Sequence, residues 1–199
     1  MNTFSRTMLC AALLVLLQSC TTTTAPLAFY DFGAMPKPDN VPGCTLPPIQ
    51  VADITGPTAL DSNLMQYRLL YDNDLQSHAY AGYRWSMTPA QLLGLRIRAQ
   101  LAAMQVKVID SGVTSPGVWQ LRLDLTDFSQ QFSDATHSVA QLQLRASVVR
   151  ANSLIAQTTL SQQSAAAKPD APSGAQAMRV ASDALLTDLN SWLCKLSRT

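Results

Sequence analysis

The sequence predicts an α+β domain in which two main helices pack on one face of a mostly antiparallel sheet. Two amphipathic helical segments and several extended segments with alternating apolar and polar residues are the basis for this prediction. Alternation with a period of two and one polar face is typical of an antiparallel sheet that is covered on one side only. The helices then cover the apolar face, because both kinds of element must bury a hydrophobic side.

The clearest strands lie in the second half of the chain. Apolar and polar residues alternate strictly in residues 119–126 and again in residues 140–148. A further extended run is expected at residues 154–160, followed by an Ala/Ser/Gln/Pro-rich loop over residues 161–174. Shorter or less regular extended segments come earlier, at residues 28–33, 49–55, 63–71, 78–85 and 106–109. Loops rich in proline or turn residues are expected at residues 36–48 and 111–117.

Both helices have recognisable signals. Thr88 is a good N-cap and Pro89 suits the first helical position, so a helix is expected to begin there. Gly94 weakens that helix by about 1 kcal/mol relative to alanine. Its apolar stripe is Leu93, Ile97, Leu101 and Met104. A second helix is expected over residues 174–196, with the stripe Met178, Ala181, Leu185, Leu189, Trp192 and Leu196.

The N-terminus has the layout of an export signal. Arg6 supplies the positive charge, and residues 9–17 form an unbroken apolar run. That run is far shorter than the ~20 residues that a membrane-spanning helix needs. The sequence Leu17-Gln18-Ser19-Cys20 then resembles the lipobox of bacterial lipoproteins, although Gln18 is not the commonest residue at its position. Residues 1–19 are therefore predicted to be a lipoprotein signal peptide, with lipidation at Cys20.

Lipidation determines how the chain meets the membrane. Resemblance to mature bacterial lipoproteins implies three acyl chains on Cys20, and two or more chains anchor stably. Thr21, which is not aspartate, implies sorting to the outer membrane by similarity to Gram-negative rules. Residues 20–27 are then a short lipidated tether that reaches ~25 Å at most. Residues 28–199 are expected to form a single α+β domain on the periplasmic face.

Composition excludes several classes of function. The formal net charge is +1, and it falls to zero without Arg6, so no basic face for nucleic acid is expected. His78 and His137 are expected on polar surface turns, and Asp72 with Asp74 in a solvated turn. The chain has no nucleophile elbow, HExxH or CxxC sequence. We therefore expect no catalytic residues, no metal site, no cofactor and no enzymatic activity.

Several short sequences together resemble one known family. They are Gln66-Tyr67-Arg68, Tyr80-Ala81-Gly82-Tyr83-Arg84-Trp85-Ser86-Met87-Thr88-Pro89, Leu92-Leu93 and Trp192-Leu193. A Tyr-Arg strand, a Tyr/Arg/Trp strand that runs into a Pro-initiated helix, and a C-terminal helix with a Trp-Leu step are similar to the ABC-type transport auxiliary lipoproteins. The resemblance covers most of the mature chain.

The resemblance implies a role in transport. It implies an outer-membrane-anchored subunit that works with an ABC permease, an ATPase and an MCE-domain protein in moving phospholipid or other hydrophobic molecules across the periplasm. It does not imply that this chain carries out a reaction, and a homo-oligomer is possible. The alternatives are a structural lipoprotein of envelope assembly without a transporter, and a periplasmic lipid carrier, which needs an enclosed apolar cavity.

The candidate residues for a partner surface are Arg84 and Trp85. Tryptophan and arginine are enriched in binding hot spots. The alternative is structural: Trp85 packs in the core and Arg84 pairs with an aspartate on the sheet.

A disulfide between Cys44 and Cys194 is also expected. Cys10 leaves with the signal peptide and Cys20 is acylated, so two cysteines remain in an oxidising compartment. Cys194 is expected beside the buried face of the last helix and not squarely within it. The alternative is two free thiols, one of them packed as a small hydrophobic residue.

Overall fold

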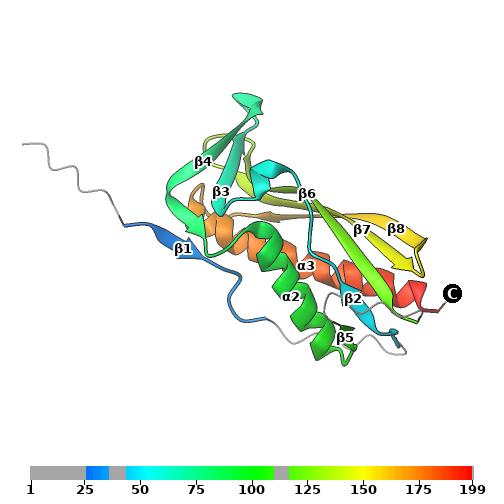
Figure 1. Cartoon of the computed structure of the whole chain (residues 1–199). Coiled ribbons are helices and arrows are strands. Elements are labelled where there is room, and N and C mark those ends of the chain that lie inside the picture. Colours follow the sequence, from blue (N-terminus) through cyan, green and yellow to red (C-terminus); the bar gives the residue numbers. More distant parts are fainter. Residues whose placement is uncertain (1–25, 36–43, 110–116, 199) are drawn as a thin grey trace, which may run out of the picture.

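The computed structural model describes residues 26–35, 44–109 and 117–198, and it forms one sheet with two long helices (Figure 1). The predicted signal peptide, Cys20 and most of its tether lie outside these residues, as do residues 36–43 of the first expected loop and residues 111–116 of the second. The strands are β1 (Ala28–Tyr30), β2 (Ile49–Val51), β3 (Leu64–Leu69), β4 (Asn73–Trp85), β5 (Val108–Ile109), β6 (Trp119–Phe132), β7 (Ser138–Arg150) and β8 (Ser153–Ala165). The helices are the short η1 (Thr58–Leu60), α2 (Pro89–Ala103) and α3 (Ala171–Leu196).

The sheet is built around β6. One edge of β6 pairs antiparallel with β7 along its whole length, and β7 pairs antiparallel with β8. The other edge of β6 is shared: its first residues pair in parallel with β2 and its last residues with β3. β3 and β4 form an antiparallel hairpin, while β1 adds to β4 and β5 adds to β2 as short parallel strands. The long pairings are thus antiparallel, as the alternating sequence predicts.

A β-bulge explains why the alternation in β6 stops before the strand does. Residues 119–125 place every second side chain in the core, and the register to β7 then shifts between Leu125 and Asp127. The extra residue at Thr126 changes which face each later side chain occupies. Phe128, which would otherwise face away from the core, is therefore 2% exposed. The strand continues to Phe132, six residues beyond the predicted end.

Both helices lie on the apolar face of the sheet, and one continuous core joins them to it (Figure 1). Thr88 caps α2 as expected, and Leu93, Ile97 and Leu101 of its stripe are at most 1% exposed. α3 packs along β7 and β8. Its stripe is buried from Met178 to Leu189, whereas Trp192 and Leu196 are only partly buried. The α+β fold with two helices and a mostly antiparallel sheet is thus the predicted one.

The loop predicted at residues 161–174 is shorter in the structure, where only residues 166–170 lie outside a strand or helix. β8 continues to Ala165, and α3 begins at Ala171, where Asp170 is the N-cap and its carboxylate accepts a hydrogen bond from the amide of Ser173 at 2.8 Å. Ser161–Ala165 has low strand propensity, but its ladder to β7 decides its conformation. β4 likewise begins at Asn73 instead of residue 78, while β1, β2 and β5 are shorter than expected.

Gly174 lets the first turn of α3 lie directly on β6. A Cβ atom at this position would lie 2.0 Å from Oε1 of Gln130, which is buried. The Gln130 amide cannot easily move, because it accepts a hydrogen bond from Tyr80 Oη at 3.0 Å and donates to Ser138 Oγ at 2.9 Å. It also donates to the carbonyl of Asp170 at 3.3 Å. The contact therefore fixes the start of α3 on the sheet.

We expect Gly174→Ala to lower the free energy of unfolding by about 1–2 kcal/mol, although alanine is the better helix former. The reason is that the new methyl group displaces the Gln130 amide and breaks its buried hydrogen bonds. Urea unfolding measures the change. In a Gln130→Ala background the same substitution should be neutral or slightly stabilising. An equal cost in both backgrounds would contradict the contact as the cause.

Candidate functional site

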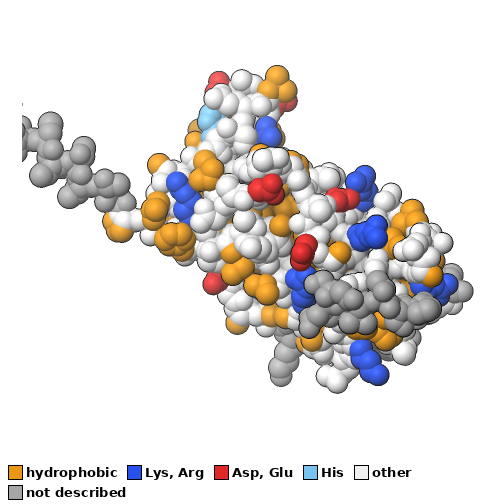
Figure 2. Space-filling model, viewed as in Figure 1, with side chains coloured by type: hydrophobic (Ala, Val, Ile, Leu, Met, Phe, Trp, Pro, Cys, Tyr) orange, Lys and Arg blue, Asp and Glu red, His pale blue; other side chains and the backbone are white. Residues whose placement is uncertain are grey.

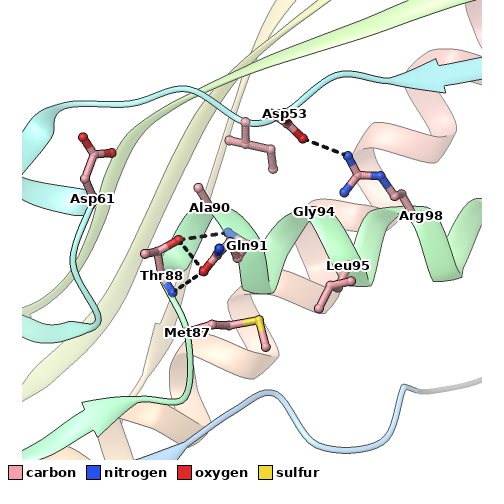
Figure 3. Close-up of a pocket in the computed structure, with 10 residues that line it drawn as sticks. Asp53, Asp61, Met87, Thr88, Ala90, Gln91, Gly94, Leu95 and Arg98 are labelled. Carbon is pink, nitrogen blue, oxygen red and sulfur yellow. Dashed lines mark hydrogen bonds and ion pairs between the residues drawn. The ribbon is translucent and has the colours of Figure 1, made fainter. Parts of the chain in front are cut away.

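A surface groove runs between the N-terminal half of α2 and the segment that follows β2 (Figure 3). Its volume is about 600 Å³. The end of β4 delivers Met87 and Thr88 to one end of the groove, directly after the Tyr/Arg/Trp sequence discussed above. The lining residues are Asp53, Ile54, Asp61, Met87, Thr88, Ala90, Gln91, Gly94, Leu95 and Arg98.

The groove combines apolar side chains with a charged rim. Ile54, Met87 and Leu95 supply apolar surface, and Leu95 is 55% exposed although it lies on a helix of the core layer. On the rim, Arg98 donates to the carbonyl of Val51 at 3.1 Å and lies 3.4 Å from the carboxylate of Asp53. An apolar side chain in a groove with polar edges is typical of a surface that binds another molecule.

Gly94 keeps this arrangement open. A Cβ atom on Gly94 would lie 3.0 Å from Nη1 of Arg98 and 3.9 Å from Cδ1 of Ile54. The missing side chain lets the Arg98 guanidinium lie close to the helix and reach the segment after β2. A glycine inside a helix lowers its stability, so a glycine at this position indicates a close approach or a site beside the helix. Gly94 is therefore the sequence signal from which the groove could have been predicted. The Asp53–Arg98 pair joins residues far apart in the chain and was not predicted.

The N-terminus of α2 is closed by its own cap. Thr88 Oγ1 accepts a hydrogen bond from the amide of Gln91 at 3.3 Å, and Gln91 Oε1 accepts one from the amide of Thr88 at 3.1 Å. This reciprocal pair is the capping box that stabilises helix starts. Because these amides are occupied, the groove offers a bound molecule its apolar lining and its rim, and not a free helix terminus.

Trp85 packs in the core, as the structural alternative expected. It is 3% exposed and lies edge-on to Phe128, with ring centroids 5.3 Å apart. Phe32 also packs edge-on against Trp85, with ring centroids 6.0 Å apart. A side chain this buried does not form part of a partner surface in this conformation.

Arg84 differs from the structural alternative. Its Nη1 donates to the carbonyls of Tyr80 and Tyr83 at 2.6 and 2.7 Å, so the guanidinium folds back on its own strand. Within the part of the chain that the structure describes, it pairs with no aspartate. The side chain is partly buried and satisfies backbone acceptors of β4.

The structure joins Cys44 and Cys194 by a disulfide, with the Cα atoms 5.3 Å apart. This distance lies inside the range expected for such a bond. The sequence placed Cys194 beside the buried face of α3. It is instead 2% exposed and lies within that face. The bond ties the segment before β2 to the last turns of α3.

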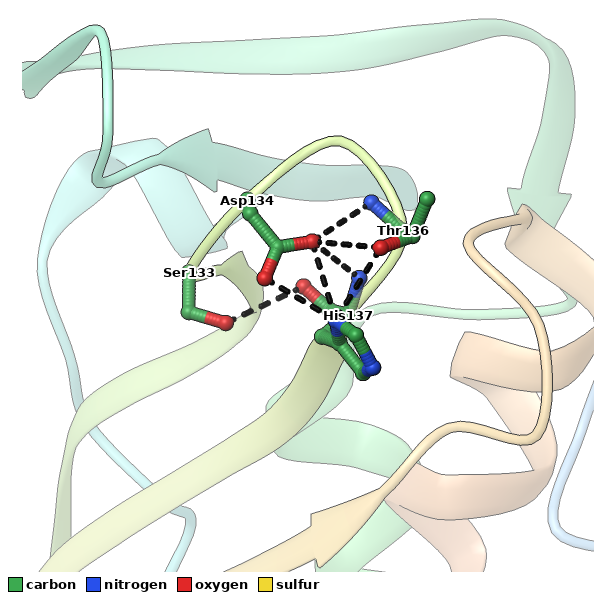
Figure 4. A network of polar contacts seen from close by, with 4 residues as sticks. All are labelled: Ser133, Asp134, Thr136 and His137. Atoms are coloured by element: carbon green, nitrogen blue, oxygen red, sulfur yellow. Dashed lines mark hydrogen bonds and ion pairs between the residues drawn. The ribbon is translucent and has the colours of Figure 1, made fainter.

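The turn between β6 and β7 gathers a serine, an aspartate and a histidine within five residues (Figure 4). Asp134 accepts hydrogen bonds from the hydroxyl and the amide of Thr136, each at 2.7 Å, and from the amide of His137 at 2.9 Å. These bonds, led by the Thr136 hydroxyl, hold the pKa of Asp134 well below its usual value. The His137 ring nitrogen lies 2.9 Å from the same carboxylate.

This cluster closes a turn and does not have the geometry of a catalytic triad. Ser133 Oγ donates to the backbone carbonyl of His137 at 3.4 Å and makes no hydrogen bond with its ring. A nucleophilic serine needs the imidazole as its base. His137 is exposed as expected, whereas His78 lies on β4, partly buried, and stacks on Tyr67 with ring centroids 5.1 Å apart.

Among residues 26–35, 44–109 and 117–198, no three His, Cys or Asp side chains gather where they could hold a metal ion. Within the same residues, no helix is both long and apolar enough to cross a membrane. The fold and the groove together define a two-layer α+β domain with an open, largely apolar surface groove.

The chain belongs to the family of ABC-type transport auxiliary lipoprotein components, whose model matches residues 30–190. The family resemblance drawn from the Tyr-Arg and Trp-containing sequences is thereby confirmed. The match spans every strand and helix described above except most of β1 and the last turns of α3.

Solved structures share the fold. Protein XCC0632 from Xanthomonas campestris, of family DUF330, superposes with a TM-score of 0.75 at 16% identity, covering 86% of this chain and 97% of its own. A second protein, described only as uncharacterized, gives a TM-score of 0.65 at 12% identity, covering 84% of this chain and 98% of its own. Likeness at these identities establishes the fold alone. No curated protein sequence matches this chain.

Proposed function

We propose that this chain is an outer-membrane-anchored lipoprotein subunit of an ABC/MCE-type transporter. It supports the movement of phospholipid or other hydrophobic molecules across the periplasm by binding partner subunits, not by catalysing a reaction. The observation that carries the proposal is the family match over residues 30–190. The lipobox ending at Cys20 and the open groove beside α2 add support, because the first supplies an anchor and the second a surface for another protein.

The filled core supports a role in binding partners over the role of a lipid carrier. The space between the sheet and the helices is occupied by side chains such as Leu93, Leu121 and Leu185, each 0% exposed. A carrier has to enclose acyl chains in a cavity of several hundred Å³. The groove beside α2 has such a volume, but it lies on the surface and carries the Asp53–Arg98 pair on its rim.

Partner binding is tested with the full-length protein. Extraction from membranes in mild detergent should co-purify the MCE-domain protein of the same transport system. Deleting this protein should weaken the envelope barrier as much as deleting the MCE protein, and the double deletion should be no worse. Additive defects, or a preparation that never contains the MCE protein, would favour the structural envelope lipoprotein instead.

A variant of the groove tests whether the groove is the contact with the MCE protein in that experiment. Leu95→Asp places a charge on the exposed apolar lining and should lower the yield of the co-purified MCE protein. Leu154→Asp is the matched control, because Leu154 is 59% exposed and Leu95 is 55% exposed, and Leu154 does not line the groove. Equal yields for both variants would show that the groove is not the contact.

Lipidation gives a separate prediction. Intact-mass measurement of the membrane-extracted protein should find a diacylated or triacylated N-terminus at Cys20. Cys20→Ser should abolish the modification and release the protein from the outer membrane, whereas Cys10→Ser, within the predicted signal peptide, should leave it unchanged. Thr21→Asp should keep the lipidated protein in the inner membrane. An unmodified soluble mature chain would contradict the anchor.

A further inference from the structure

The β3–β4 hairpin projects from the sheet and ends in an apolar tip, defined here as residues 70–75 (Figure 1). Leu75 is 87% exposed, Tyr71 51% and Leu70 43%. Figure 2 shows hydrophobic side chains gathered at the end of the projection, with acidic side chains beside them. Single exposed leucines are ordinary, but three large apolar residues within six positions of one turn indicate a contact surface.

The tip is ordered by hydrogen bonds before it meets any partner. The amide of Asp72 donates to the carbonyl of Leu69 at 3.1 Å, and the amide of Leu75 donates to Oδ1 of Asn73 at 3.1 Å. Arg68 Nη1 donates to the carbonyl of Asp74 at 3.1 Å. An apolar surface that is already held in one conformation loses little entropy when it binds.

The stem of the hairpin is stiffened by aromatic rings. Tyr67 on β3 contacts His78 and Tyr80 on β4, with centroid distances of 5.1 and 4.6 Å. It also packs edge-on against Phe132 of β6 at 5.8 Å. These contacts hold the stem of the hairpin against the end of β6.

The charges at the tip restrict what it can bind. Asp72 and Asp74 are both exposed, and Arg68, which donates to the backbone carbonyl of Asp74, forms no ion pair with either carboxylate. Carboxylates beside an apolar tip are repelled by the anionic lipids of a membrane surface. They are complementary to a protein pocket that is apolar inside and bordered by lysine or arginine.

We propose that the hairpin tip inserts Leu75 and Tyr71 into an apolar pocket of a partner protein whose rim is basic. The tip is a second contact surface, at the far end of β4 from the groove beside α2. This docking role is inferred from the exposure, order and charge of residues 70–75, and it does not require the partner to be an MCE protein.

The test uses a photoreactive phenylalanine analogue at position 75 of the full-length lipidated protein in intact cells. Position 154, on β8, is the matched control because Leu154 is also a highly exposed leucine next to a hairpin turn. A protein adduct at position 75 and not at 154, identified by mass spectrometry, is the expected result. Adducts with lipid only, or none, would overturn the proposal.

The identified protein is then purified, and its affinity for the detergent-solubilised full chain is measured. Leu75→Ser should raise Kd about tenfold or more, and Leu154→Ser should leave Kd unchanged. Asp72→Lys with Asp74→Lys should also weaken binding and reduce its dependence on salt. Unchanged affinity in both tip variants would overturn the proposal, and thermal unfolding checks that each variant is folded.

The two proposals can fail separately. If the MCE protein co-purifies but position 75 forms no protein adduct, the docking role of the tip is wrong and the transporter assignment stands. If position 75 captures a different protein with the expected charge dependence, the tip is a docking surface and the MCE partnership is wrong.

Discussion

Replacing Cys44 with serine should lower the free energy of unfolding by about 2–5 kcal/mol, which is the largest single effect expected in this chain. The bond closes a loop between residues 150 positions apart, so it removes much of the conformational freedom of the unfolded chain. Cys44 is the better site to change because Cys194 is buried and Cys44 is only partly so. Denaturant unfolding in oxidising buffer measures the difference.

Reduction provides the control for that experiment. The wild type with a reductant should unfold at the same denaturant concentration as Cys44→Ser without one, because both lack only the cross-link. The reductant should not affect the variant. If both thiols of the oxidised wild type react with a maleimide under native conditions, the disulfide is absent and the prediction fails.

Asp183→Ala should lower the free energy of unfolding by about 3 kcal/mol. Its carboxylate lies 2.7 Å from Nε of Arg96, a side chain that is 5% exposed and lies over the ring of Phe32. Removing the aspartate leaves a buried cation without its counter-charge, which costs about 3–5 kcal/mol when the pair is fully buried. We expect the lower end because the Asp183 side chain is 28% exposed and water screens the pair.

Two comparisons separate burial from charge in this second experiment. Arg96→Met combined with Asp183→Leu should recover most of the loss, because no uncompensated charge remains. Arg145→Ala breaks the ion pair between Arg145 and Asp124, whose side chains are 52% and 41% exposed. This change should lower the free energy of unfolding by less than about 1 kcal/mol. A similar cost for Arg145→Ala and Asp183→Ala would contradict the role of burial.

Sequence periodicity predicted the parts of the fold whose cause is local. The alternation in β6 and β7 and the cap of α2 at Thr88 depend on neighbouring residues, and each is found as expected. The length of β6 was not predictable, because the bulge after Leu125 reverses the faces of the residues that follow. The C-terminal part of β8 was missed for a different reason: its Ala/Ser/Gln composition follows the ladder to β7, not its own propensity.

The candidate sites depend more strongly on tertiary structure. Met87 and Thr88 of the groove lie in the sequence that carried the family resemblance, and Gly94 was noticed for its cost to the helix. Their meeting with Asp53 requires β2 to pair with β6, which no local pattern encodes. Leu70 and Tyr71 were placed at the end of the extended segment 63–71, and only the position of the turn shows that they are exposed at its tip.

If Cys20 is lipidated as proposed, the disulfide also limits how far the domain can move from that anchor. β1 pairs with β4 over only three residues, so a pulling force on the anchor acts first on a short contact. With β1 in place, the tether allows a distance of ~25 Å from the membrane. If β1 and the buried Phe32 both detached, the chain between Cys20 and Cys44 would extend to about 80 Å and then stop, because Cys44 is bonded to the last turns of α3. Tension beyond that point would load the longest helix of the domain instead of unravelling the sheet strand by strand.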